Sequence, residues 1–395
     1  MKDGKELKIL EVIDTYYPTV DGAINVAKFY CQELNKISNC TLAAPKGAKK
    51  AKYVDKENFE VVRCSSFPAP EKYRVALPFL DGKLKKRIKG EEIDIVHTHS
   101  PFGMGRFAVK TAKKKNVPVV ATLHTQYHQD FKRVVKFNFL VKFMLRFIMK
   151  VFNRADSVWT VSNKSCEILR DYGYKGKIEV IRNGTDFKYP ENASALVERV
   201  NKLHNLEGQK NVLLFVGRMA WYKNLKIIVD AIEIVKKSGA DFKMVFVGGG
   251  FDYQDVKKYA LDKGLGDCCI FTGAVKDKEL LQGYYLRGDL MIFPSTFDMA
   301  PVTAVEAAAH HLCAVMTRGS CSAECIVDGE NGFLADENAQ SFADKIIEVI
   351  SIEGLTEKVG KRAGETLYRS WEMVAEEVKQ KYQQIISEYK EKQKK

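Results

Sequence analysis

Two carboxylates and two cations in the second half of the sequence have the chemistry of a binding site for an anionic, hydroxyl-rich ligand. Asp298 and Glu306 lie eight positions apart in STFDMAPVTAVEAAA, which begins at residue 295. A carboxylate can accept a hydroxyl hydrogen bond on each oxygen, so it suits sugar and ribose hydroxyls. Arg218 and Lys223, in VGRMAWYKNL, could neutralise a diphosphate. Each residue alone also fits a structural role, as a turn aspartate, an exposed helix glutamate or part of a cationic surface loop.

A helix start between the two carboxylates would add backbone donors. Pro301 fits the first turn of a helix, where its missing N–H costs nothing. Val302, Thr303 and Ala304 would then present free N–H groups to an anion at the positive end of the helix dipole. The small residues that follow, AAA at 307–309, favour tight packing and therefore a buried helix.

Other residues that could meet a ligand also follow apolar runs. The run of glycines at 248–250 would let a ligand approach the backbone, or would simply form a turn. Val275 follows CIFTGA, where backbone groups could meet a base. His97 and His99 end IDIVHTH, and His124 ends VVATLH. One histidine is more often structural than catalytic, but three after two apolar runs indicate a functional edge.

The elements that must position these residues alternate between short apolar runs and helical patterns. Several runs are continuously apolar, as strands covered on both faces are. Alternation of strands with helices predicts parallel, doubly wound sheets of the α/β class. The strands are expected at KILEVID, CTLAAP, FEVVRC, IDIVHTH, PVVATLHT, SVWTVS and IEVIRNG, and then at VLLFVGR, FKMVFVGGG, CCIFTGAV, LMIFPST, LCAVMTRG and NGFLAD.

The length of 395 residues allows two domains of ordinary size. The strand-poor, polar stretch from 186 to 208 separates the two series of strands. We therefore expect two Rossmann-like domains, at 1–186 and 187–370, followed by an amphipathic helix at 371–395 that packs back toward the first. Ligands of such sheets bind outside the carboxyl ends of the strands, so two facing sheets predict a central cleft.

Composition excludes several classes of protein. No stretch is long and apolar enough to span a bilayer, and the charged N-terminus is not that of a signal peptide. Nine scattered cysteines, without the spacing of a zinc site, indicate free thiols in a reducing cytoplasm. A nucleic-acid-binding role is suggested only by the pI of about 9.1, because no DNA- or RNA-binding signature is present. A nicotinamide-dependent oxidoreductase is disfavoured because the first strand lacks a following GxGxxG.

The positive charge of +13 lies in the first half of the chain. Residues 1–185 hold 35 basic and 19 acidic residues, whereas 186–395 hold 28 and 31. Residues 131–154 carry seven basic residues and no acid, and the phenylalanines at 137, 139, 143, 147 and 152 are expected on other faces of the helix. A basic, aromatic, amphipathic helix is typical of a membrane-surface element, although its apolar faces could instead be core. The residues predicted to meet an anionic membrane are Lys132, Arg133, Lys136, Lys142, Arg146 and Lys150.

Together these motifs resemble the family-4 retaining glycosyltransferases of the GT-B architecture. The resemblance covers nearly the whole chain and is carried by YYPTVDGAINV, HTHSPFG, ATLHTQY, TVSNKS, VIRNGTDF, FVGRMAWYKN, the two carboxylates, GSCSAECIVDGENGFL and the late SW. Each motif is weak alone, but their order and spacing are specific. Within the family, DTYYPTVDGA, HTHSPFGMG and EAAA are most similar to bacterial 1,2-diacylglycerol 3-glucosyltransferases.

The resemblance implies a retaining, metal-independent hexosyltransferase without a cofactor, whose donor is a nucleotide sugar such as a UDP-hexose. Arg218 and Lys223 would grip the diphosphate and stabilise the leaving group. Glu306 would bind the ribose, Asp298 the sugar hydroxyls, and His124 the sugar near the reacting carbon. The other residues expected to contact the donor are Gly22, Gly217, Val275, Val302 and Thr303.

The acceptor and the donor sugar stay open at this stage. A lipid hydroxyl at the inner face of the cell membrane fits the basic first half, whereas a soluble, polysaccharide or cell-envelope acceptor is the alternative. The family usually has glutamate where Asp298 stands and glycine where Pro301 stands. The shorter carboxylate and the lost backbone donor bear on donor identity, so glucose, galactose and N-acetyl sugars are all compatible, and the oligomeric state is not specified.

Overall fold

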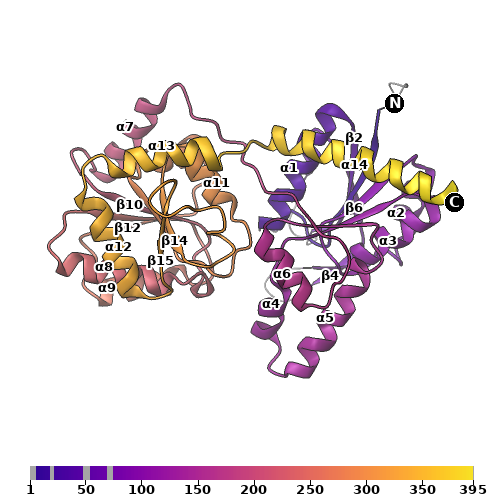
Figure 1. Cartoon of the computed structure of the whole chain (residues 1–395), viewed down its shortest axis with the longest axis horizontal. Helices are drawn as coiled ribbons and strands as arrows, with labels where there is room; N and C mark the ends of the chain where they lie inside the picture. Colours follow the sequence, from indigo (N-terminus) through magenta and orange to yellow (C-terminus); the bar gives the residue numbers. More distant parts are fainter. Residues whose placement is uncertain (1–5, 18–21, 48–53, 69–73, 395) are drawn as a thin grey trace. The chain divides into compact units, whose positions relative to one another are not determined.

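The computed structural model describes residues 6–17, 22–47, 54–68 and 74–394. The chain divides into two compact units, of which the first combines Met1–Asn183 with Trp371–Lys395 and the second is Gly184–Ser370. Each unit is built on one parallel β-sheet flanked by helices (Figure 1). This is the predicted α/β class, with two doubly wound sheets.

The first unit has a seven-stranded sheet in the order β3-β2-β1-β6-β7-β8-β9. The central strands form where a run of apolar residues is buried from both sides by helices, whereas the edge strands β3 and β9 are only partly buried. The strand order reverses direction at the edge between β1 and β6, which pair in parallel. The strands are β1 (Lys8–Val12), β2 (Asn39–Pro45), β3 (Glu60–Cys64), β6 (Ile95–Thr98), β7 (Val119–Leu123), β8 (Ser157–Thr160) and β9 (Glu179–Val180), and the helices are α1 (Gly22–Ile37), α2 (Gly82–Gly90), α3 (Gly103–Lys115), α4 (Tyr127–Val134), α5 (Asn138–Phe152) and α6 (Asn163–Asp171).

The second unit has a six-stranded sheet in the order β12-β11-β10-β13-β14-β15. Here the order reverses between β10 and β13, which are also parallel neighbours. The strands are β10 (Val212–Val216), β11 (Lys243–Val247), β12 (Cys269–Gly273), β13 (Leu290–Phe293), β14 (Ala314–Thr317) and β15 (Phe333–Ala335), and the helices are α7 (Ala193–His204), α8 (Leu225–Lys237), α9 (Tyr253–Asp262), α10 (Lys278–Arg287), α11 (Val302–Ala309), α12 (Ala339–Ser351) and α13 (Leu355–Leu367).

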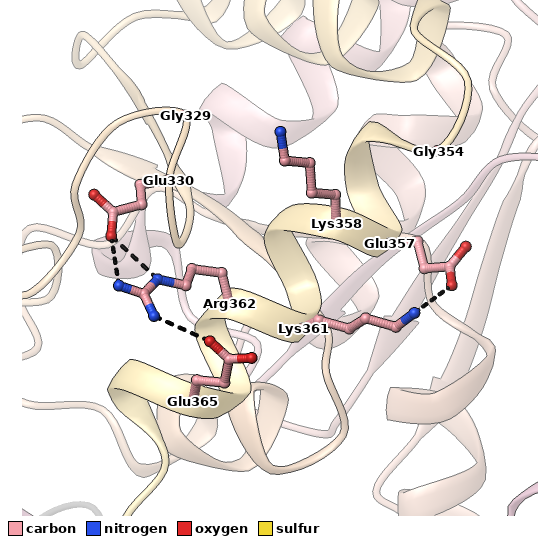
Figure 2. Close-up of a pocket in the computed structure, with 8 residues that line it drawn as sticks. All are labelled: Gly329, Glu330, Gly354, Glu357, Lys358, Lys361, Arg362 and Glu365. Carbon is pink, nitrogen blue, oxygen red and sulfur yellow. Dashed lines mark hydrogen bonds and ion pairs between the residues drawn. The ribbon is translucent and has the colours of Figure 1, made fainter.

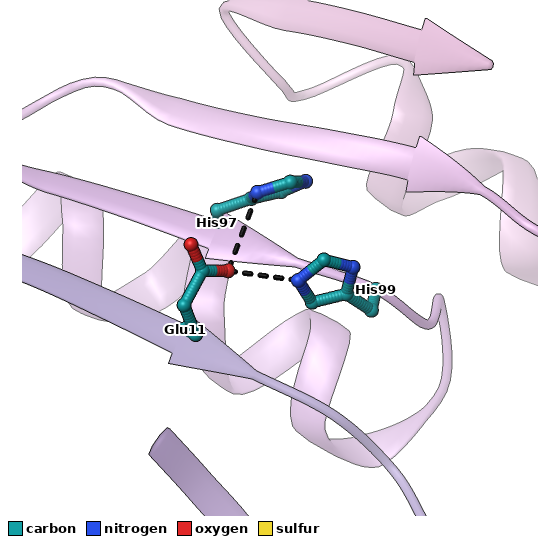
Figure 3. A group of neighbouring side chains, drawn as sticks. All are labelled: Glu11, His97 and His99. Atoms are coloured by element: carbon teal, nitrogen blue, oxygen red, sulfur yellow. Dashed lines mark hydrogen bonds and ion pairs between the residues drawn. The ribbon is translucent and has the colours of Figure 1, made fainter. Parts of the chain in front are cut away.

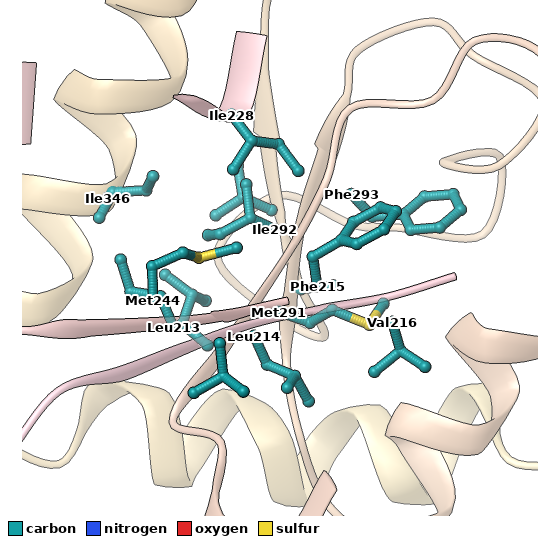
Figure 4. Packing of buried hydrophobic residues seen from close by; sticks show 14 of the residues in the cluster. Leu213, Leu214, Phe215, Val216, Ile228, Met244, Met291, Ile292, Phe293 and Ile346 are labelled. Atoms are coloured by element: carbon teal, nitrogen blue, oxygen red, sulfur yellow. The ribbon is translucent and has the colours of Figure 1, made fainter. Parts of the chain in front are cut away.

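The core of the second unit explains why its strands are apolar throughout. Figure 4 shows side chains of β10, β11 and β13 packed with Ile228 of α8 and Ile346 of α12. Leu213, Leu214 and Phe215 are consecutive and all fully buried, so both faces of β10 are covered. Successive side chains on a strand point to opposite faces of the sheet, so a sheet with helices on both sides buries consecutive residues in this way.

The last helix, α14 (Trp371–Lys394), belongs to the first unit and lies along α1 (Figure 1). The ring of Trp371 stacks on Phe29 of α1 with centroids 5.4 Å apart. Trp371 and Tyr382 are both buried, as expected of its apolar anchors. Tyr382 also uses its hydroxyl, which hydrogen-bonds to Glu11 of β1 and to His97 of β6.

Two features of the first unit differ from the sequence-based prediction. The basic segment 131–154 is not one helix, because α4 ends at Val134 and α5 begins at Asn138. Val135 is extended (φ −120°, ψ 119°), and the pair of β-branched residues at 134–135 gives the helix a weak point. A short antiparallel hairpin, β4 (Ser66–Pro68) with β5 (Arg74–Ala76), was not predicted, since three-residue strands carry little periodicity.

Candidate active site

The carboxyl ends of β10 and β13, where the strand order of the second sheet reverses, bring a lysine and an aspartate together. The Nζ of Lys223 lies 2.7 Å from each carboxylate oxygen of Asp298. Ser295 donates a hydrogen bond to the same carboxylate at 2.5 Å. Both side chains are largely buried, with 13% and 20% exposed. An ammonium has three N–H bonds, so one is left for another acceptor at the point where such sheets bind their ligands.

Glycines position the loop that carries Arg218. A Cβ on Gly248 would lie 1.9 Å from the carbonyl oxygen of Gly217, and one on Gly250 would lie 2.1 Å from that of Met219. Any larger residue would therefore collide with backbone. Met219 donates its N–H to the carbonyl of Gly249 at 2.9 Å. The run of glycines thus serves close packing of two loops, and the Arg218 guanidinium lies over the ring of Phe251, 6.0 Å from its centroid.

The start of α11 is partly as predicted. Pro301 is the residue before the helix rather than a member of its first turn, with φ −66° and ψ 127°. Ala304 was expected to offer a free N–H, but it donates to the carbonyl of Pro301 at 3.1 Å. The first-turn amides of Val302 and Thr303 have no recorded partner within the described chain, and the buried Oγ1 of Thr303 has none there either. These groups could meet an anion or a hydroxyl.

Glu306 lies on α11 and is not an exposed helix glutamate. Its carboxylate accepts a 2.6 Å hydrogen bond from the hydroxyl of Tyr285 on α10. Burial raises the pKa of Glu306 to about 7, against the opposing effect of the Tyr285 hydrogen bond. The group therefore changes charge near neutral pH, which is unusual for a carboxyl and typical of functional sites. Val275, after β12, packs partly buried against the core of the same unit.

In the first unit, the predicted residue His124 follows β7 and ends a chain of buried polar groups. Its Nε2 lies 2.9 Å from Nδ1 of His99, whose Nε2 lies 2.8 Å from a carboxylate oxygen of Glu11. Gly22, the other first-unit residue expected to contact a donor, is the exposed first residue of α1. The preceding PTVD of the predicted closing loop lies outside the described residues.

The residues expected at a membrane lie on α4, on α5 and between them. Lys132, Arg133, Lys136, Lys142, Arg146 and Lys150 are all exposed. Of the phenylalanines, Phe152 is buried in the core, but Phe137, Phe139 and Phe143 have exposed fractions of 65%, 72% and 64%. No described helix has the length and hydropathy to cross a membrane.

Glu11, His97 and His99 form a cluster that the spacing of histidines and cysteines did not predict (Figure 3). Their nitrogen and oxygen atoms lie within 4.8 Å of one another, and in the described part of the chain this is the one such group that could hold a metal ion. All three side chains are fully buried. The ring nitrogens and carboxylate oxygens are already engaged in hydrogen bonds with one another or with neighbouring side chains. The arrangement is therefore complete as a hydrogen-bonded cluster.

A depression of about 740 Å³ on the second unit does not coincide with these sites (Figure 2). It is lined by charged residues of α13 and the loop before β15, and most of them are paired with one another. Arg362 bonds both Glu330 and Glu365, and Lys361 bonds Glu357. None of the residues predicted to bind a donor lines it.

Comparison with known families decides the class of the protein. The family model described as "Glycosyltransferase Family 4" matches residues 20–189, and the model "Glycosyl transferases group 1" matches residues 197–366. Between them the two models account for most of both units. The chain belongs to the family-4 glycosyltransferases. This glycosyltransferase is 28% identical over 303 residues to the alpha-monoglucosyldiacylglycerol synthase of Streptococcus pneumoniae, covering 75% of this chain and 68% of the relative.

Another relative and two solved structures extend the comparison. The alpha-monoglucosyldiacylglycerol synthase of Acholeplasma laidlawii is 25% identical and matches 83% of this glycosyltransferase and 84% of its own chain. The structure of HepE from Anabaena in complex with UDP has a TM-score of 0.77, at 18% identity, covering 96% of this chain and all of that one. The sucrose-phosphate synthase of Thermosynechococcus elongatus also has a TM-score of 0.77, at 18% identity, covering 96% and 99%. These likenesses establish the GT-B fold.

Four residues that hydrogen-bond to the predicted site residues, or to the histidines behind them, were not predicted from the sequence of the glycosyltransferase. Tyr285 and Ser295 bond Glu306 and Asp298, and no local pattern marks them. Glu11 could have been noticed, because a charged residue inside the apolar run KILEV must be buried and needs partners. Tyr382 was interpreted only as an apolar anchor.

Proposed function

We propose that this glycosyltransferase moves a hexose from a nucleotide sugar to the hydroxyl of a membrane lipid of the diacylglycerol type, with retention of configuration and without a metal. The observation that carries the lipid acceptor is the exposed aromatic and basic surface at the corner of α4 and α5. We call this surface the corner patch and define it by Val134, Phe137, Phe139 and Phe143 with Lys132, Arg133, Lys136 and Lys142. A peripheral position on the cytoplasmic face of the membrane follows from this proposal.

The corner patch has the composition of a membrane-binding element. Three phenylalanines are more than 60% exposed, and Val134 is 73% exposed. Apolar side chains of this kind are usually buried in a core. Figure 1 shows that the turn between α4 and α5 projects away from the sheet of the first unit. Each basic residue near an anionic leaflet contributes about 1 kcal/mol, and apolar side chains add to this by entering the interface. The relatives named alpha-monoglucosyldiacylglycerol synthases favour the same acceptor class.

A nucleotide-sugar donor is supported by the chemistry of the second unit. Lys223 is held where the strand order of the second sheet reverses, with one N–H available for a ligand. Arg218 lies in the same loop. The amides of Val302 and Thr303, which have no partner among the described residues, add positive potential at a helix start. HepE, which shares the fold, was solved with UDP and with UDP-glucose. We propose that Glu306 binds the ribose and Asp298 a sugar hydroxyl.

The proposed reaction requires stabilisation of a leaving diphosphate. The bond between the anomeric carbon and the phosphate oxygen breaks, and the acceptor hydroxyl attacks the same face of the oxocarbenium-like sugar. Because the hydroxyl attacks the face that the diphosphate leaves, configuration is retained, and the proton of that hydroxyl passes to the departing phosphate oxygen. Fixed cations and backbone N–H groups stabilise the developing negative charge. Lys223 and Arg218 would fill the role that a divalent ion has in other enzymes.

Donor binding should strengthen as pH rises through 7. In the ionised form Glu306 can accept a hydroxyl on the oxygen that Tyr285 does not use, and its pKa of about 7 makes that form scarce at pH 6. From pH 6 to pH 8 the ionised fraction rises roughly tenfold, so the affinity for UDP-glucose should rise by up to about tenfold. Calorimetric titration measures this, and UDP-glucose is suitable because its diphosphate does not titrate in this range. Glu306→Gln should bind more weakly and lose the pH dependence, and an unchanged pH profile in this variant would rule out the assignment.

A transfer assay tests the proposal as a whole. Purified protein is incubated with a panel of nucleotide sugars and with vesicles that contain diacylglycerol, and products are identified by mass spectrometry. A glycolipid whose anomeric configuration equals that of the donor, formed at an undiminished rate in the presence of EDTA, is the expected result. Transfer to soluble sugars alone would contradict the lipid acceptor, and activity that returns only with added Mg²⁺ would contradict metal independence.

A further inference from the structure

A chain of buried hydrogen bonds leads from the last helix of the protein to His124. It crosses the place where the strand order of the first sheet reverses, between β1 and β6. The hydroxyl of Tyr382 on α14 lies 2.7 Å from Oε1 of Glu11. Oε2 of Glu11 lies 2.8 Å from Nε2 of His99, and Nδ1 of His99 lies 2.9 Å from Nε2 of His124 (Figure 3 shows Glu11 and His99). Glu11, His99 and Tyr382 are fully or almost fully buried.

The carboxylate at the centre sets the direction of every bond. Burial alone would raise the pKa of Glu11, but the neighbouring His97 and His99 outweigh it and hold the pKa well below its ordinary value. An ionised carboxylate only accepts, so Tyr382 donates its O–H and His99 donates its Nε2–H. In a neutral imidazole the other nitrogen is then an acceptor. Nδ1 of His99 therefore receives the Nε2–H of His124.

The remaining branch of the cluster is satisfied by the same assignment. Nδ1 of His97 donates to the oxygen of Tyr382 at 2.5 Å, and Nε2 of His97 accepts from the hydroxyl of Thr122 at 2.7 Å. Each buried donor has one acceptor, so the pattern is self-consistent. One ring nitrogen is left over: Nδ1 of His124, for which the described residues provide no hydrogen bond. His124 is the only one of these three histidines that is partly exposed.

We propose that Glu11, His99 and Tyr382 are positioning residues that hold His124 as the Nε2–H tautomer, so that its Nδ1 lone pair accepts a hydrogen bond from a hydroxyl of the donor sugar. A buried carboxylate that accepts the N–H of an imidazole selects its tautomer and fixes its orientation. Through its hydrogen bond to Glu11, Tyr382 ties this arrangement to α14, which packs along α1. The inference rests on the proposed function for the sugar contact of His124, but the tautomer itself does not.

The tautomer can be measured without any substrate. Protein labelled with ¹⁵N in the histidine rings is recorded by long-range ¹H–¹⁵N NMR at pH 8, and the His124 signals are assigned by their loss in His124→Gln. We expect a protonated Nε2 and an unprotonated Nδ1. The opposite pattern in the wild-type protein would overturn the proposal, and so would one bound zinc ion per chain in the purified protein, since the cluster would then be a metal site.

Glu11→Gln gives the sharper test because its shape is almost unchanged. A glutamine can still accept from Tyr382 with its oxygen, but its amide nitrogen donates to Nε2 of His99. Both rings should then reverse, and His124 should carry its proton on Nδ1. Transfer should fall by about 100-fold in kcat, as expected when a contacting group is wrongly presented. An unreversed tautomer in Glu11→Gln would overturn the network, and a reversed tautomer with normal kcat would overturn its role in transfer.

Tyr382→Phe tests the contribution of the last helix, with Tyr389→Phe as the matched control on the same helix. Tyr389 is not fully buried and has no hydrogen bond recorded within the described residues. Tyr382→Phe should lower kcat and broaden or shift the His124 ring signals, whereas Tyr389→Phe should change neither. Equal behaviour of the two variants would count against the proposal. If the wild-type protein shows the expected tautomer but transfers no sugar from any nucleotide donor, the proposed function fails and the hydrogen-bond network stands.

Discussion

Lys223→Ala should lower kcat for sugar transfer by about 10²- to 10³-fold, the effect of removing one fixed group that stabilises charge developing in a transition state. The ammonium of Lys223 is held by both oxygens of Asp298 at 2.7 Å, and its third N–H is the one that we propose binds the leaving diphosphate. The fold should survive, because Asp298 retains the hydrogen bond from Ser295. Steady-state kinetics with a nucleotide sugar measures the loss, and circular dichroism checks the fold.

Lys226→Ala is the control for this prediction. Lys226 lies three residues further along, on α8, where it is 65% exposed and pairs with Asp230. Lys226→Ala removes one positive charge from the same part of the sequence but leaves the Lys223–Asp298 pair intact. We therefore expect kcat to stay within about twofold of the wild type. Similar losses in the two variants, or normal turnover in Lys223→Ala, would refute the assignment of Lys223 to the leaving group. Asp298→Asn combined with Lys223→Ala should be less damaging than the product of the two single effects, since the residues act as a pair.

Replacing Phe137, Phe139 and Phe143 together by serine should abolish most binding to anionic vesicles. If each ring contributes about 1 kcal/mol by partial burial in the interface, the triple change lowers partitioning by about 100-fold. The thermal stability should hardly change, because all three rings are exposed in the folded protein. Vesicle flotation measures binding, and transfer to a lipid acceptor should fall in parallel.

Exposed leucines elsewhere provide the matched control for the corner patch. Leu203 and Leu261 of the second unit are 55% and 52% exposed, so serine at these positions removes a similar kind of surface. This double variant should bind vesicles as the wild type does. Undiminished vesicle binding by the triple phenylalanine variant would exclude the corner patch as the membrane-contacting surface and would remove the main support for a lipid acceptor.

Some of the active-site assignment could be predicted from local sequence and some could not. Arg218 and Asp298 were predicted to bind a donor because they follow apolar runs, and the carboxyl ends of parallel strands meet at one edge of a sheet. The ion pair between Lys223 and Asp298 was not predicted, because the two residues are 75 positions apart and meet only because β10 lies beside β13. The hydrogen bond from the hydroxyl of Tyr285 on α10 to Glu306 was not predicted either, because no local sequence pattern indicates it.

The break between α4 and α5 shows the limit of periodicity. Apolar and basic residues continue across Val135 with little interruption, so a single helix was the simplest prediction for this segment. Which phenylalanines are exposed could not be predicted from their spacing either: Phe152 enters the core while Phe139 stays on the surface. Packing of α5 against the neighbouring α3 and α4, not the pattern itself, decides which face is covered.

The α/β class, the position of nearly every sheet strand and the family could be predicted without a structure, because these depend on runs of apolar residues and on motifs that are local in the chain. Tertiary structure alone decided how the polar groups are paired. Glu11, His99, His124 and Tyr382 are spread over most of the chain, and only the strand order and the return of α14 bring them within hydrogen-bond distance. A buried carboxylate must find partners wherever the fold places them, so the hydrogen bonds that lead to His124 come from residues that no local pattern connects to it.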